Sequence, residues 1–192
     1  ERDLGTLKFV AHKSPSGVVI DKLYLIGDDI DAQGAASWSL EDGQHRTNVQ
    51  ATVNTNTLGA LFKEAGQPGN FAQGGATRIT FEAGWNVPPF ALSLDNMTGA
   101  LEFHAGAGRF QDVDTSRGAQ LIGLFNLRIL PRILTFDMSS FFKKGLGFDN
   151  IFGRFQIESG QAYTNDLTLD SPTARISFAG RTGIVGQDYD QI

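Results

Sequence analysis

Residues 152–181, FGRFQIESGQAYTNDLTLDSPTARISFAGR, decide the fold class of this chain. Apolar residues alternate with polar ones in three successive pieces, which carry Phe155 and Ile157, Leu167 and Leu169, and Ile176 and Phe178. A period of two is typical of strands with one buried face. Ser159-Gly160 and Ser171-Pro172 separate the pieces and favour tight turns. The stretch therefore predicts an antiparallel meander, over residues 148–182.

The same alternation continues toward the N-terminus. Residues 1–54 predict a meander of four strands, with turns at Pro15-Ser16-Gly17, Gly27-Asp28-Asp29 and Asp42-Gly43. Residues 74–111 predict further strands. The apolar positions of these two regions include Leu23, Leu25, Ile79, Phe81, Leu101 and Phe103.

Two helical regions interrupt the strands. Residues 55–66 have apolar residues at helical spacing, with Asn54 or Asn56 as the cap and Gly66 as the stop. Residues 114–145 contain a second helix, near 116–130, which ends or kinks before Pro131. That helix is apolar around most of its circumference, so we expect other elements to surround it.

The elements predict one mainly β architecture with a few helices. A weak internal repeat places the segment from Gly17 over the segment from Gly160, so that Leu23 and Leu25 fall on Leu167 and Leu169. Repeated hairpins with one apolar face favour stacking into an elongated, curled antiparallel sheet, partly covered by the helix near 116–130. We expect residues 1–192 to form one segment of a longer protein, because the chain lacks an initiator Met.

Composition excludes several classes of protein. The chain has 192 residues, of which 41% are hydrophobic and 19% charged, so disorder is not expected. The net charge of −5 comes from interspersed charges, and nucleic acids would require a basic stripe. No cysteine is present, which excludes disulfides and cysteine nucleophiles. No apolar run reaches the roughly 20 residues of a membrane-spanning helix, and no signal peptide is recognisable.

The sequence also argues against an enzyme. His12, His45 and His104 lie in different strand contexts without a carboxylate at a useful spacing, and no nucleophile, phosphate-loop or zinc-protease motif occurs. Solvated or packed histidines are the simpler interpretation. We therefore predict no catalytic residue and no cofactor.

Two acidic groups resemble calcium ligands: Asp28, Asp29 and Asp31 at a turn, and Asp112 and Asp114 before the apolar helix. Asp28 and Asp29 are also turn formers, and Asp114 suits a helix cap, so we predict no metal site. Trp38 and Trp85 are candidates for a sugar-binding platform, but their apolar neighbours favour the core.

Several short motifs resemble one known family. They are Gly108-Arg109-Phe110 with Asp112-Val113-Asp114, the leucine-rich helix ending at Leu130-Pro131-Arg132, Gly147-Phe148-Asp149, and Ser171-Pro172-Thr173-Ala174-Arg175-Ile176 closing at Gly180-Arg181. Together they resemble the C-terminal region of the YhdP group of AsmA-like envelope proteins of Gram-negative bacteria. The resemblance covers the whole chain, more loosely before Gly99. Asn86-Val87-Pro88-Pro89 departs from the shorter Trp-Pro-Gly turn of that group.

The resemblance implies a periplasmic segment of an inner-membrane-anchored protein, in which a long sheet curls into an apolar groove that carries phospholipid between membranes. The groove-facing residues would be the alternating apolar ones: Leu23, Leu25, Ile79, Phe81, Leu101, Phe103, Phe155, Ile157, Leu167, Leu169, Ile176 and Phe178. Contact with a membrane or a lipid head group would fall to Leu121, Phe125, Arg128 and Arg132, and Lys143-Lys144 could add to it. Protein partners are not identifiable from the sequence.

A second interpretation stays open. The apolar faces could form an ordinary closed core, with the helices packed on the sheet. The segment would then be a structural cap or a partner-docking domain of the same envelope protein, without lipid contact.

Overall fold

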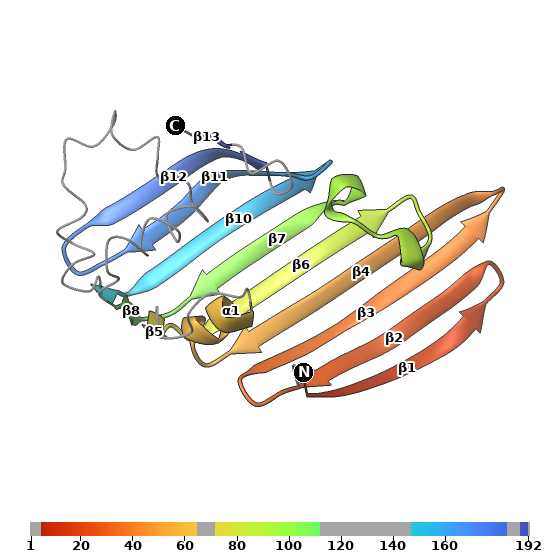
Figure 1. Cartoon of the computed structure of the whole chain (residues 1–192), viewed down its shortest axis with the longest axis horizontal. Coiled ribbons are helices and arrows are strands. Elements are labelled where there is room, and N and C mark those ends of the chain that lie inside the picture. The colour runs from red at the N-terminus through yellow and green to blue at the C-terminus, as the bar shows by residue number, and fades with distance from the viewer. Residues whose placement is uncertain (1–4, 65–71, 112–146, 184–188, 192) are drawn as a thin grey trace.

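The computed structural model describes residues 5–64, 72–111, 147–183 and 189–191. Within these residues, ten strands form one antiparallel sheet in the order β1-β2-β3-β4-β6-β7-β10-β11-β12-β13. The first five are β1 (Thr6–Ser14), β2 (Gly17–Ile26), β3 (Ile30–Glu41), β4 (Gln44–Thr55) and β6 (Thr77–Trp85). The others are β7 (Thr98–Ala105), β10 (Asn150–Glu158), β11 (Gln161–Asp170), β12 (Arg175–Gly183) and β13 (Tyr189–Gln191). Figure 1 shows them side by side in chain order.

The predicted β meanders are confirmed, because their turns have the geometry that the sequence predicts. Asp42 and Gly43 have φ of 50° and 77°, and Ser159 and Gly160 have φ of 49° and 74°. Two central residues with positive φ fit the twist of a two-residue hairpin. At the third turn the main-chain N–H of Ser171 donates to the carbonyl of Ala174 at 2.8 Å.

The sheet is irregular at a few places, and at several glycines the main chains of neighbouring strands approach closely. The pairing shifts register in β1–β2 (Val10/Ala11), β2–β3 (Ile20/Leu23), β10–β11 (Phe152/Gln156) and β11–β12 (Thr164/Leu167). At Gly34 of β3, an added Cβ would collide with the carbonyl oxygen of Gln50 on β4. Shifts of this kind increase the local twist and bend a sheet.

Helix α1 (Leu58–Glu64) confirms the first predicted helix but begins differently. The main-chain N–H of Gly59 donates to the Thr57 hydroxyl at 3.3 Å, so Thr57 takes the capping role predicted for Asn54 or Asn56. Asn54 instead accepts a hydrogen bond from Arg78 Nε at 3.0 Å. The predicted stop at Gly66 lies outside the described residues.

A small second sheet and α1 build the closed core. Strands β5 (Ala72–Gly74), β8 (Gly108–Phe110) and β9 (Gly147–Phe148) pair in that order. The core contains the buried residues Leu58, Ala72, Ala105, Phe110, Phe148 and Ile151. The rings of Phe110 and Phe148 meet at a centroid distance of 4.9 Å. This core lies at the end of the large sheet where Thr55, Thr77, Ala105 and Ile151 are paired neighbours.

The opposite end of the sheet has a loop, residues 86–97, that the sequence analysis left without structure. It connects β6 to β7 and contains two short 3-10 helices, η2 (Pro89–Ala91) and η3 (Leu94–Asn96). The second predicted helix, near 116–130, and the rest of region 114–145 lie outside the described residues. The described part is therefore a large open antiparallel sheet with a few helices.

Candidate functional site: the apolar face of the large sheet

One face of the large sheet carries rows of apolar residues that run across the strands from β1 to β10. Directly paired residues of antiparallel strands point to the same side of a sheet. One row across seven strands is Phe9, Leu23, Gly34, Ala51, Phe81, Leu101 and Phe155. The adjacent row is Leu7, Leu25, Ala32, Val53, Ile79, Phe103 and Gly153. We call the side that carries these rows the apolar face.

The strand register brings all twelve sequence-predicted groove residues to this face. Leu23, Phe81, Leu101 and Phe155 lie in the first row, and Leu25, Ile79 and Phe103 lie in the second. Ile157 pairs with Gly99 on β7. Leu169 pairs with Ile151 of β10 and with Ile176, and Leu167 pairs with Phe178. Alternation alone predicted a face for each strand, and the register joins these separate faces into one.

Burial divides the apolar face into two parts. All twelve predicted residues are half-buried. Three of them, Phe103, Leu167 and Leu169, pack against the closed core below α1. On β1–β4, by contrast, no apolar side chain is buried, and Leu7 and Phe9 are 57% and 62% exposed. Among the described residues, a closed core thus covers one end of the face, and no other element covers the apolar side chains of β1–β4.

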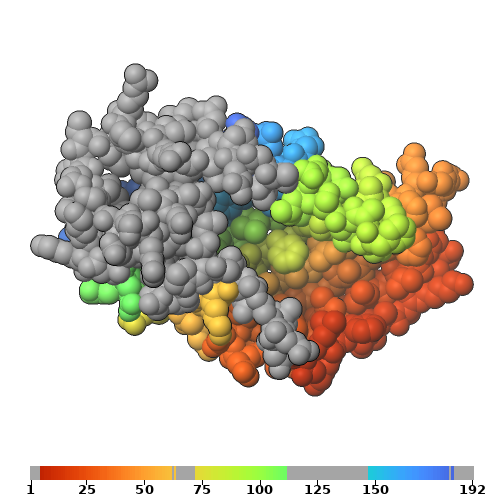
Figure 2. Space-filling model, viewed as in Figure 1, coloured from red at the N-terminus to blue at the C-terminus, as the bar shows by residue number. Residues whose placement is uncertain are grey.

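Small side chains form the middle of the apolar face on β3 and β4. Ala32, Gly34 and Ala36 lie opposite Val53, Ala51 and Val49. Larger side chains follow on the next strands, with Phe81 opposite Ala51 and Leu101 opposite Phe81. The surface is hollowed between the loop and α1, and the yellow strand β6 is visible at the bottom of this hollow (Figure 2).

Loop 86–97 stands at the rim of the apolar face and is fixed there by side chains of that face. Trp85 Nε1 donates to the carbonyl of Ser93 at 2.9 Å, and Thr47 Oγ1 donates to the carbonyl of Val87 at 2.8 Å. Thr47 and Trp85 are paired neighbours at the end of the apolar rows. Sequence reasoning missed this loop as a functional feature, although Pro88-Pro89 followed by Phe90, Leu92 and Leu94 is an available signal.

The tryptophans lie on the apolar face rather than in a closed core. Trp38 pairs with Thr47 and is half-buried, as is Trp85. Trp38 Nε1 donates to His45 Nδ1 at 3.1 Å, and the two rings stack at a centroid distance of 5.9 Å. Both tryptophans donate their indole N–H to partners within the protein.

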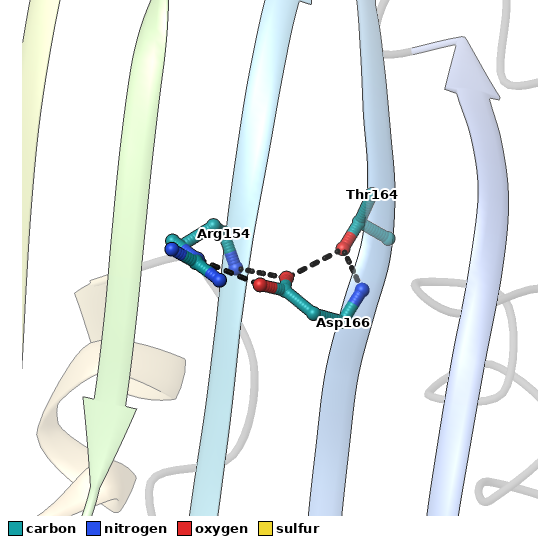
Figure 3. Close-up of polar contacts among 3 residues, drawn as sticks. All are labelled: Arg154, Thr164 and Asp166. Carbon is teal, nitrogen blue, oxygen red and sulfur yellow. Dashed lines mark hydrogen bonds and ion pairs between the residues drawn. The ribbon is translucent and has the colours of Figure 1, made fainter.

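The opposite face of the sheet is polar. One of its rows contains Gln33, Thr52, Thr80, Glu102 and Arg154. Where the β10–β11 pairing shifts, the carboxylate of Asp166 lies in the gap between the two strands (Figure 3). It accepts from the Arg154 main-chain N–H at 3.0 Å and from Arg154 Nε at 2.6 Å. The main-chain hydrogen bond, together with the guanidinium, holds the pKa of Asp166 below its ordinary value.

The three histidines have different neighbours. His12 Nδ1 lies 2.7 Å from Asp21 Oδ2 on the adjacent strand. The sequence did not predict this carboxylate partner, because the pairing of the two strands brings the residues together. Both side chains are about half exposed. His45 contacts Trp38, and His104 lies on the polar face opposite Arg78.

Acidic residues in the described part do not cluster around a metal position. Within that part, no three His, Asp or Glu side chains are close enough to hold an ion. Asp29 of the predicted turn lies 4.0 Å from Lys63 Nζ. The second acidic pair, Asp112 and Asp114, lies outside the described residues.

The residues predicted to contact a membrane or a head group lie outside the described part of the chain. They are Leu121, Phe125, Arg128 and Arg132, together with Lys143-Lys144. Among the described residues, no helix has the length and hydropathy needed to cross a bilayer.

Comparison with known proteins supports the family inferred from the motifs. Curated proteins and solved structures give no match. The family model described as "YhdP protein" matches residues 1–192, the whole chain. The match includes the paired strands that carry the apolar face as well as the short motifs near the C-terminus. The chain therefore belongs to the YhdP family.

Proposed function

We propose that this chain is a segment of a Gram-negative envelope protein that moves phospholipid between membranes, with the apolar face as the wall of a groove. The single observation that carries the proposal is the continuous apolar row from Phe9 to Phe155, which crosses seven strands. Its open N-terminal part offers apolar surface that the described residues do not cover. Membership of the YhdP family is consistent with an envelope protein of this kind.

The energetic requirement for lipid transport is the shielding of acyl chains. Exposing one methylene group to water costs about 0.8 kcal/mol, so exposing the two acyl chains of one phospholipid costs roughly 20 kcal/mol in total. A row of apolar side chains, partly exposed on β1 and half-buried on the following strands, reduces this cost without a reacting group. The proposed mechanism is partition: acyl chains lie on the apolar face, and head groups stay in water at its open side.

Movement along the face needs sites of similar affinity. The rows contain only alanine, glycine and aliphatic or aromatic side chains from β1 to β10, so no charged group interrupts them. A lipid therefore exchanges one apolar neighbour for another as it moves. The anchor in the inner membrane, the periplasmic location of this segment and the absence of catalysis belong to the same proposal.

A second function is favoured by the closed core. Phe103, Leu167 and Leu169 pack against buried residues below α1, so this end of the sheet resembles an ordinary α+β core. In this alternative, the segment caps the longer protein or docks a partner, and lipid does not reach it.

Photocrosslinking from matched positions tests the two functions. A photoreactive residue replaces Phe81 or Phe155 on the apolar face, or Glu82 or Gln156 on the polar face of the same strands, in the full-length protein in cells. We expect phospholipid adducts at Phe81 and Phe155 and none at Glu82 and Gln156. Adducts at Phe103, which packs against the core, should be fewer. Equal labelling of both faces, or no lipid at Phe81 and Phe155, would favour the structural cap.

A further inference from the structure

Loop 86–97 exposes apolar side chains away from the sheet. Phe90 is 89% exposed, the highest value among the large apolar residues that the structure describes as exposed. Leu94 and Leu92 on the same loop are 47% and 37% exposed. Asp95 is the one ionisable residue of the segment. Exposed apolar residues within one short loop are typical of a surface that meets another apolar phase.

The loop holds this tip in a fixed conformation. Asn96 Oδ1 accepts from the Ser93 main-chain N–H at 3.1 Å, and Asn96 Nδ2 donates to the carbonyl of Ala91 at 3.3 Å. The Ala91 main-chain N–H donates to the carbonyl of Pro88 at 2.9 Å. Phe90 is therefore held out into solvent by a hydrogen-bonded loop rather than by a chain without structure.

We propose that loop 86–97 inserts into the interfacial region of a lipid bilayer, with Phe90 at the point of deepest contact. A bilayer accepts a protruding side chain of any shape, whereas a protein partner needs a pocket that fits it. Pro88 and Pro89 have no main-chain N–H, and Ala91 and Ser93 use theirs inside the loop. Insertion consequently leaves fewer unsatisfied main-chain donors than a loop of ordinary composition would.

The position of the loop connects the bilayer to the apolar face. Trp85 directly precedes the loop and lies at the end of the apolar rows. Its indole N–H donates to the carbonyl of Ser93 in the loop. Tryptophan is enriched at membrane interfaces. A lipid that leaves the apolar face beside Trp85 would then meet the bilayer without crossing open water. In this respect the inference rests on the proposed function, whereas the membrane contact itself does not require lipid on the apolar face.

The charge of the loop specifies the kind of membrane surface. The loop has no lysine or arginine, and the chain as a whole has a net charge of −5. Attraction to anionic lipid therefore contributes nothing to this contact. We expect binding to zwitterionic vesicles that does not increase when anionic lipid is added.

A single-cysteine label tests the contact directly, because the chain has no cysteine of its own. A polarity-sensitive dye is attached to Phe90→Cys or to the control Val10→Cys, which is 59% exposed on the polar side of β1. On vesicles of phosphatidylethanolamine and phosphatidylcholine, we expect a several-fold rise in emission at position 90 and quenching by acyl-chain nitroxides. Position 10 should show neither.

Vesicle flotation with Phe90→Asp and Val10→Asp provides the second measurement. Both positions are exposed, so neither change empties a core. Loss of one phenyl group from an apolar phase predicts at least about a tenfold loss of binding for Phe90→Asp and no change for Val10→Asp. Binding of Phe90→Asp at the wild-type level, or no binding of the wild-type chain, would overturn the inference. So would shielding of the dye at position 90 by protein alone, which would indicate a protein contact.

The outcomes separate this inference from the proposed function. Phospholipid adducts at Phe81 without a response of the dye at position 90 would remove the membrane contact and keep the transport function. Insertion at position 90 without adducts at Phe81 would keep the membrane contact and remove the transport function.

Discussion

At the break in the β10–β11 pairing, the carboxylate of Asp166 accepts a hydrogen bond from the main-chain N–H of Arg154. In the regular parts of the sheet, a main-chain carbonyl group of the neighbouring strand takes this acceptor role. The Arg154 side chain binds the same carboxylate, and the guanidinium lies 5.6 Å from the centre of the Phe152 ring. Thr164 on β11 completes the group (Figure 3). One side chain thus bridges two strands at a place where their main chains do not pair.

The first prediction concerns Asp166→Asn. Removing the charge should lower the free energy of unfolding by about 1–2 kcal/mol at pH 7, because hydrogen bonds to charged groups are stronger than neutral ones. Since the folded pKa of Asp166 is lowered, its stabilising contribution is complete above the unfolded value of about 3.8. That contribution is lost as the pH falls through the folded pKa. Urea denaturation at pH 7 and pH 3 should show the difference between wild type and variant shrinking at pH 3.

Asp170→Asn is the matched control for this prediction. Asp170 also pairs with an arginine, Arg175, whose hydrogen bond lowers the pKa of Asp170, and its side chain is as exposed as that of Asp166. Its replacement should cost less than that of Asp166, because only Asp166 of the two accepts the Arg154 main-chain hydrogen bond at a break in strand pairing, whereas an exposed ion pair alone contributes little. An equal loss for both variants would contradict the bridging role of Asp166.

At the scale of elements, α1 and the small sheet make one end of the apolar face a core, while β1–β4 remain open. Leu58 of α1 is 4% exposed and touches the core cluster, whereas Phe9 of β1 is 62% exposed. These two residues therefore report on different environments, although both are apolar residues of regular elements.

The second prediction compares Leu58→Ala with Phe9→Ala. Leu58→Ala should lower the free energy of unfolding by about 2–5 kcal/mol, because it leaves a cavity in a closed core. Phe9→Ala should cost less than about 1 kcal/mol, although it removes more atoms, because the ring is already in solvent. Urea denaturation of the two variants provides the measurement. A large loss for Phe9→Ala would show that β1 lies in a core.

The same contrast between covered and open strands explains which features of the fold the sequence predicts and which it does not. Period-two alternation predicts the strands, and Asp42-Gly43 and Ser159-Gly160 predict turns that the structure confirms. Alternation is identical for Leu23 and Leu25 and for Leu167 and Leu169, yet only the second pair packs against the core. Alternation specifies a face of a strand, but burial depends on what covers that face. The sequence shows the apolar residues of loop 86–97 but not the position of the loop on the sheet, because that position depends on the hydrogen bonds that Thr47 and Trp85 donate to the loop carbonyls.

At the scale of the whole molecule, the proposed transport of lipid requires an uninterrupted apolar path across the sheet. Ala51 lies in the middle of the first row, between Gly34 and Phe81, and Gln50 precedes it on the polar face. The two adjacent positions allow the same charge to be placed on either side of the sheet.

The third prediction is that Ala51→Glu blocks lipid and Gln50→Glu does not. A carboxylate in the row must either be desolvated by the acyl chains or keep water beside them, and both are unfavourable. Phospholipid adducts from a photoreactive residue at Phe155 should fall about tenfold with Ala51→Glu, while both proteins remain folded by circular dichroism. Similar adduct yields for the two variants would count against a continuous path.

The order of the strands has a consequence for how such a molecule acquires its length. The strands of the large sheet are paired in the order in which they occur in the chain. The chain leaves this sheet twice, through α1 and β5 and through β8 and β9, and each time it returns beside the strand that it left. Neighbouring strands are about 4.8 Å apart, so ten strands span roughly 43 Å and each further hairpin would add about 10 Å. Insertion of a hairpin would lengthen the sheet without rearranging any existing pair. Reach is therefore an additive property of this architecture, and evolution can adjust it to a given distance in steps of one hairpin.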